Sequence, residues 1–141
     1  MRVLRTLAAL LHWKLVVPLS ALVLAACAPE VVRQPTQLTP ITEQPGATIE
    51  ILEDAPISVG PAGYRRVISR GSVWMRIGRS VEGEVYKPVD RVFTVEGAQI
   101  HEAYLVLDGD RVVGFYLPVE RAFSPAPGGP GTRLSIRRRQ P

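Results

Sequence analysis

The stretch of sequence that decides the fold is HEAYLVLDGDRVVGFYL, residues 101–117. Two apolar runs, His101 to Leu107 and Arg111 to Leu117, flank the polar triplet Asp108-Gly109-Asp110. An Asp-Gly pair between two runs of β-prone residues is a strong signal for a tight hairpin turn. We therefore predict two antiparallel strands joined by a turn at residues 108–110, at the centre of a mostly β protein.

Shorter runs on the N-terminal side of this hairpin continue the two-residue alternation of apolar and polar residues. We expect further strands at residues 65–69, 72–77, 84–87 and 91–95, and an edge strand at residues 47–53. Pro88-Val89-Asp90 could instead begin a short helix. Short strands at this spacing predict a small antiparallel sheet or an open barrel.

The chain of 141 residues divides into unlike segments around this sheet. Residues 47–124 form the predicted globular domain. Residues 27–46 are rich in Pro, Gln and Thr, and we expect them to form a flexible tether. Residues 125–141 combine Pro and Gly with a basic end, and this composition predicts a disordered C-terminal tail.

The distribution of charge argues against a nucleic-acid-binding protein. The chain carries 17 basic and 13 acidic residues, but four of the basic ones, Arg133, Arg137, Arg138 and Arg139, lie in the last nine residues. Residues 28–132 hold 10 basic against 13 acidic residues. The sequence contains no dense stripe of Lys and Arg with interleaved aromatic residues, so we expect no nucleic acid among the partners.

The first 26 residues have the order of a secretory signal peptide. Arg2, Arg5 and Lys14 make the start basic, and residues 15–24 form a largely apolar run. The uncharged stretch 15–29 is shorter than the roughly 20 residues that a membrane-spanning helix needs. We therefore expect an export signal here in preference to a permanent membrane span.

The quartet Leu24-Ala25-Ala26-Cys27 ends this run, and Cys27 is the only cysteine of the chain. The quartet resembles the lipobox of bacterial lipoproteins. The resemblance implies that Cys27 receives a diacylglyceryl group, that residues 1–26 are removed, and that the new amine is acylated with a fatty acid such as palmitate. A lone thiol in an oxidising compartment agrees with a modified cysteine.

The resemblance also implies a location. Several acyl chains would hold the protein on a membrane, which becomes its first partner. In Gram-negative lipoproteins an Asp after the cysteine favours retention at the inner membrane, and this chain has Ala28 there. We therefore expect the cell envelope, at the periplasmic face of the outer membrane. The alternatives are a soluble secreted protein cut after Ala26, and an uncleaved anchor.

Candidate catalytic and metal-binding residues are few. His101 and Glu102 are neighbours in a predicted strand, so their side chains should point to opposite faces. Asp108 and Asp110 could offer oxygen ligands to calcium, but the twelve-residue loop pattern of a calcium site is absent from the sequence. We predict no catalytic residue, no metal and no cofactor, and we do not expect an enzyme.

Trp74 is the candidate for a partner surface. If Val73, Met75 and Ile77 face inward, Trp74 and Arg76 face outward on a sheet too small to cover both of its faces. We therefore predict a structural or adaptor lipoprotein that binds another envelope protein through this face or through a sheet edge. The alternative is a small-ligand-binding or sensing domain, which would require a pocket.

Overall fold

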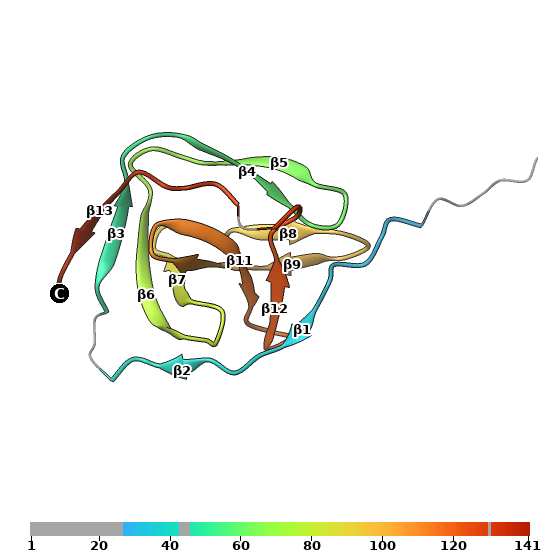
Figure 1. Ribbon diagram of the computed structural model, residues 1–141, viewed down its shortest axis with the longest axis horizontal. Coiled ribbons are helices and arrows are strands. Elements are labelled where there is room, and N and C mark those ends of the chain that lie inside the picture. Colours follow the sequence, from blue (N-terminus) through green and yellow to red (C-terminus); the bar gives the residue numbers. More distant parts are fainter. Residues whose placement is uncertain (1–26, 43–45, 130) are drawn as a thin grey trace, which may run out of the picture.

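The computed structural model describes residues 27–42, 46–129 and 131–141, and within these ranges it contains β-strands and no helix. All strand pairs are antiparallel, and the sheets are not closed into a barrel (Figure 1). The predicted fold class, a mostly β protein with antiparallel pairing, is thus confirmed.

One large sheet forms the body of the molecule. Its strands follow in the order β1 (Gln34–Pro35), β12 (Ala122–Pro125), β11 (Arg111–Leu117), β10 (Tyr104–Asp108), β7 (Glu84–Pro88), β6 (Val73–Arg79), β3 (Thr48–Ile51) and β13 (Ile136–Arg139). A ninth strand, β2 (Thr39–Pro40), also pairs with β6. Two separate hairpins complete the fold, β4 (Ala55–Val59) with β5 (Tyr64–Ile68), and β8 (Thr94–Glu96) with β9 (Ile100–Glu102).

The predicted central hairpin forms as β10 and β11, with Asp108 opposite Arg111. Gly109 has a φ of 63°, a backbone conformation that glycine adopts without steric cost, and this explains the turn. The first predicted strand, however, is divided at Ala103. His101 pairs with Val95 in the β8–β9 hairpin, whereas the residues after Ala103 belong to the main sheet.

Other expected strands form with shifted bounds. The stretch predicted at residues 91–95 begins as β8 only at Thr94, and Pro88 ends β7 in place of starting a helix. The strand predicted at 47–53 forms as β3, but it lies inside the sheet because β13 pairs along its other side. Strand β4 had no counterpart in the sequence prediction.

Both faces of the main sheet are covered, and each carries a hydrophobic cluster. The larger cluster includes Trp74, Tyr86 and Phe115, and the two separate hairpins contribute Ile57, Ile68 and Val95 to it. The smaller cluster is built from Val85, Tyr104, Val106, Tyr116 and Phe123, with Leu38 and Ile77 packed against it. A sheet covered on two sides leaves less apolar surface exposed than the sequence suggested.

The N-terminal segment is not a free tether, and this prediction is wrong for its described part, residues 27–42. Val31 is buried, β1 pairs with β12, and β2 pairs with β6. Between these pairings Leu38 packs on the smaller cluster, and Figure 1 shows the segment passing below the body from β1 to β2. The prolines are compatible with this arrangement because edge strands tolerate residues without an N–H donor.

The C-terminal tail is also ordered, so the prediction of a disordered tail is wrong. Leu134 is buried in the larger cluster, and β13 pairs with β3 from Ile136 opposite Ile51 to Arg139 opposite Thr48. The basic end lies against an acidic partner, Glu50, that is far away in the sequence, so local composition could not predict its order.

Candidate functional site

The structure places the predicted partner-surface residue Trp74 in the core. Only 1% of Trp74 is exposed, its ring packs edge-on against Phe93 with centroids 5.7 Å apart, and its indole N–H donates to the Ser72 hydroxyl at 3.1 Å. The prediction that Trp74 faces outward is therefore wrong. The alternation along β6 is as expected, but the side that holds Trp74 is the side that the hairpins cover.

Arg76 lies on the same side of β6 as Trp74, at the end of the covered region. It lines a cavity of about 280 Å³ between β3, β6, β7 and β13. Ile41, Ala47 and Ile49 form an apolar wall of this cavity. Glu84, Tyr86 and Arg138 bring polar groups to it.

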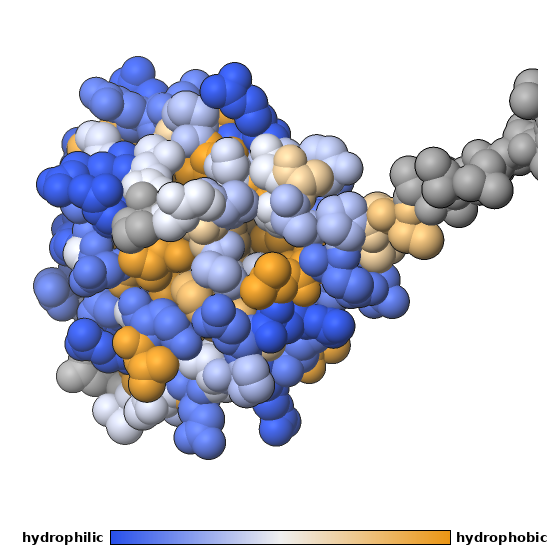
Figure 2. Space-filling model, turned by 45° about the vertical axis from the view of Figure 1, so that its right-hand side comes forward, coloured by the Kyte–Doolittle hydropathy of each residue, from blue (hydrophilic) through white to orange (hydrophobic). Residues whose placement is uncertain are grey.

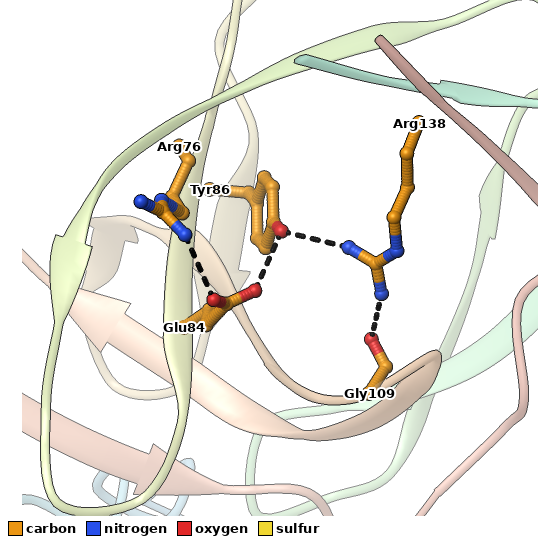
Figure 3. A network of polar contacts seen from close by, with 5 residues as sticks. All are labelled: Arg76, Glu84, Tyr86, Gly109 and Arg138. Carbon is orange, nitrogen blue, oxygen red and sulfur yellow. Dashed lines mark hydrogen bonds and ion pairs between the residues drawn. The ribbon is translucent and has the colours of Figure 1, made fainter. Parts of the chain in front are cut away.

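Figure 3 shows that these polar side chains form one connected network. The Arg76 guanidinium pairs with Glu84 Oε1 at 3.0 Å, and the Tyr86 hydroxyl donates to Glu84 Oε2 at 2.8 Å. Arg138 donates from Nη1 to the Tyr86 hydroxyl at 3.1 Å and from Nη2 to the Gly109 carbonyl at 2.7 Å. The network thus ties β6, β7, β13 and the central turn together.

Tyr86 is held in its neutral form. Burial of the phenol raises its pKa above the ordinary value, and the hydrogen bond and negative charge of Glu84 raise that pKa further, against the opposing charge of Arg138. A neutral Tyr86 can donate to Glu84 and accept from Arg138 at the same time. The hydroxyl therefore acts as a bridge between the carboxylate and the second guanidinium.

The described part of the network is incomplete at one atom. Arg76 Nε is buried and has no hydrogen-bond partner among the described residues. A buried N–H without an acceptor costs free energy, so this donor detracts from the stability that the network supplies.

Strand β13 offers a second feature, a sheet edge with no further strand paired to it among the described residues. It is the last strand of the main sheet, and Figure 1 draws it at the margin of the molecule with β3 on its inner side. Ile51 directs its N–H and carbonyl away from β13, toward Ser72 and Gly71. Because Ile136 stands opposite Ile51, the backbone groups of Ile136 point to the outer side of β13.

The side chains of β13 make this edge positively charged. Arg137, Arg138 and Arg139 are all exposed, and two of them, Arg137 and Arg139, pair with the single carboxylate of Glu50. Charged side chains on an edge strand hinder pairing between identical edges while still permitting an oppositely charged strand.

His101 forms a buried pair that the sequence did not predict. Its side chain is 3% exposed, and Nδ1 lies 2.5 Å from the Glu120 carboxylate in the turn between β11 and β12. Glu102, its sequence neighbour, is exposed on the opposite face, as the strand geometry predicted. Neither His101 nor Glu120 lines the cavity beside Arg76.

The remaining candidate residues show no assembled metal site. Asp110 contacts Arg133 at 3.4 Å, and Asp108 lies exposed at the end of β10. In the described ranges, no three His, Cys, Asp or Glu side chains gather as metal ligands. Cys27 is exposed with a free thiol, whereas Leu24, Ala25 and Ala26 of the lipobox lie outside the described residues.

Sequence reasoning missed most of the network, although part of its signal was present. Glu84 and Tyr86 are two residues apart in a predicted strand and so share a face, and Arg76 stands opposite Tyr86 in the neighbouring strand. Arg138 carried no such signal, because its position depends on the pairing of β13 with β3.

Comparisons with known proteins identified no relative of this chain. No family model matches the chain, and no curated protein or solved structure is significantly similar to it. Among the described residues, no helix has the length and apolar character needed to cross a bilayer.

Proposed function

We propose that this chain is a cell-envelope lipoprotein, anchored through a lipid on Cys27 at the periplasmic face of the outer membrane, that acts as a protein-binding adaptor. Its β-domain receives an extended, acidic segment of another envelope protein as an additional strand on β13. The observation that carries this proposal is the outer edge of β13, which pairs with no strand in the part of the chain that the structure describes.

The charge and the backbone geometry of β13 both support an extended, acidic segment as the partner. The outward N–H and carbonyl groups can pair with an added strand, and the three arginines favour a partner with Asp or Glu side chains. An apolar patch is a weaker candidate for the contact. Figure 2 shows separate apolar patches surrounded by hydrophilic residues, and exposed valines such as Val81 and Val119 are scattered in the sequence.

The anchor and the edge lie at different ends of the domain. Cys27 is exposed, and the chain reaches the body at Pro29, whose carbonyl accepts the Ala98 N–H at 3.1 Å. In Figure 1 this end of the chain and β13 lie on opposite sides of the molecule. A lipid on Cys27 would hold the domain close to the bilayer with β13 directed away from it.

The lipid is tested by mass spectrometry of the mature N-terminus from bacterial membranes. We expect a chain that begins at Cys27 and carries diacylglyceryl and acyl groups, and we expect Cys27→Ala to be uncleaved or soluble. An unmodified thiol, or a mature start at another residue, would contradict the lipoprotein proposal.

The edge is tested by a matched pair of substitutions at Ile136. Ile136→Pro removes the outward N–H, whereas Ile136→Ala shortens the same side chain and keeps the N–H. Each tagged variant is cross-linked and purified from solubilised membranes, and the bound proteins are compared. We expect Ile136→Ala to retain the partner and Ile136→Pro to lose it, with both variants folded by circular dichroism.

Two further results decide the proposal. If Ile136→Pro retains the partner, the contact does not use this edge. Reversing the charge with Arg137→Glu and Arg139→Glu should also remove an acidic partner, and undiminished capture by that variant would rule out the acidic segment.

A further inference from the structure

We infer that the surface around Pro29 is a second membrane contact, which lies in the headgroup layer of the bilayer and is held there by exposed apolar side chains. The inference rests on the proposed function, because it requires the lipid on Cys27. It adds the part of the domain that this lipid would bring against the membrane.

The attachment of the chain to the body leaves almost no tether after Cys27. The Pro29 carbonyl accepts the Ala98 N–H at 3.1 Å, and Val31 is 3% exposed. Only Cys27 and Ala28 therefore separate the lipid from the body, and two extended residues span at most about 7 Å. The headgroup layer of one leaflet is about 5–8 Å thick. A lipid on Cys27 would thus bring this end of the body into the headgroup layer.

Two turns of the domain adjoin this attachment point. Gly97, between β8 and β9, packs so closely that an added Cβ would lie 2.8 Å from the Pro29 carbonyl oxygen and from a methyl group of Val31. Gly60, between β4 and β5, packs in the same way against the carbonyl of Glu96, the neighbour of Gly97. Figure 1 shows both turns near the N-terminal segment, on the side of the molecule opposite β13.

Exposed apolar side chains lie around this point. Val32 is 52% exposed, and Ile100, which stands opposite Glu96, is 72% exposed. Pro61 is also exposed, and it lines one surface hollow together with Val32 and Pro127. Exposed apolar groups of this kind fit the boundary between headgroups and acyl chains. Because the lipid already holds the domain at the bilayer, the contact needs little affinity of its own.

Two ion pairs lie near the same surface. Glu30 pairs with Arg33 at 3.7 Å, and Arg66 pairs with Glu96. A paired charge costs less to bring into the headgroup layer than a lone carboxylate does. Attraction to anionic lipids is therefore not required, and we expect the contact to form on vesicles of phosphatidylcholine, which carries no net charge.

The test uses a tryptophan placed at this surface. The chain from Cys27 onward contains one tryptophan, Trp74, which is buried, so an added tryptophan reports on its own surroundings. Lipidated Val32→Trp is placed in phosphatidylcholine vesicles whose acyl chains carry bromine, which quenches nearby tryptophan. Val89→Trp is the control, because Val89 is also exposed and its N–H donates to the carbonyl of Val73, at the start of β6.

We expect the bromine to quench the emission of Val32→Trp. The emission of Val89→Trp should change no more than that of the unsubstituted chain. Equal quenching of the two variants, or none in Val32→Trp, would overturn the inference. Mass spectrometry of the same sample separates the two proposals. A chain without lipid on Cys27 would contradict both, whereas a lipidated chain without quenching would contradict the membrane contact alone.

A matched pair of substitutions separates apolar contact from simple nearness to the bilayer. Pro61→Asp places a carboxylate beside Val32, whereas Pro61→Ala keeps the position uncharged. In the Val32→Trp background, Pro61→Asp should lower the quenching because a lone carboxylate resists transfer out of water, and Pro61→Ala should retain it. Both variants are checked for folding by circular dichroism. Unchanged quenching in Pro61→Asp, or equal loss in both, would contradict an apolar contact.

Discussion

Replacing Trp74 by alanine should unfold or nearly unfold this domain. The side chain is 1% exposed and packs against Phe93, so its removal leaves a cavity in the larger cluster. Truncation of a buried Trp to Ala costs about 3–5 kcal/mol, and small domains have a total stability of about 5–15 kcal/mol. For a domain of this size, the melting temperature should fall by at least about 10 °C.

The loss should come from packing and not from a stranded polar group. Ser72, which accepts the indole N–H, still donates its own hydroxyl to the Ser69 carbonyl at 2.6 Å after the change. Trp74→Phe keeps a ring beside Phe93, and it should therefore lose no more than about half as much stability.

Urea denaturation followed by far-ultraviolet circular dichroism is the appropriate measurement, because the substitution removes a fluorescent residue. Val67→Ala is the control, since Val67 is exposed on β5 and its truncation should change stability by no more than about 0.5 kcal/mol. If Trp74→Ala and Val67→Ala had the same denaturation midpoint and the same slope, the assignment of Trp74 to the core would be refuted.

Three other outcomes follow from the structure. Gly109→Val places a side chain at a φ of 63° and should cost about 1–3 kcal/mol in a thermal melt, whereas Asp110→Asn alters only an exposed 3.4 Å contact and should be nearly neutral. His101→Ala and Glu120→Ala should each destabilise the domain, and a double-mutant cycle should give a coupling energy of about 1–3 kcal/mol between them. Additive effects of the two substitutions would show that these side chains do not interact. Because the pKa of Tyr86 is raised in the folded protein, the unfolded chain loses the phenol proton first as the pH rises. The contribution of Tyr86 to the free energy of unfolding should be fully present below pH 10 and decline above it, so stability should fall less steeply in Tyr86→Phe. Identical stability profiles of the two proteins at alkaline pH would contradict this assignment.

The sequence predicted those parts of the fold that depend on local chemistry. The turn at Gly109 needs only its own backbone preference and the two flanking runs, and it forms as expected. The alternation along β6 was also correct. It could not show which face is buried, because the cover for Trp74 includes Phe93, nineteen residues away.

The terminal segments could not be predicted because their ordering depends on distant partners. Residues 34–40 contain few apolar side chains, yet Leu38 finds a cluster made by strands from the other half of the chain. From the sequence, Arg137 and Arg139 belong to a basic run typical of a solvated tail. In the structure, the pairing of β13 with β3 places both of them beside Glu50. The candidate site shares this limit, since Arg138 reaches Tyr86 only through the same pairing.

The pairing of β3 with β13 has a consequence for how the chain folds. Thr48 and Arg139 are about ninety residues apart, as are Gln34 and Phe123 in the pairing of β1 with β12. Closing such long loops makes contact order high, and proteins dominated by distant pairings fold in milliseconds to seconds, not microseconds. Because β3 is completed only by residues about ninety positions later in the chain, a chain truncated before Leu134 would leave β3 as a bare edge and Leu52 without its bond to Ser135.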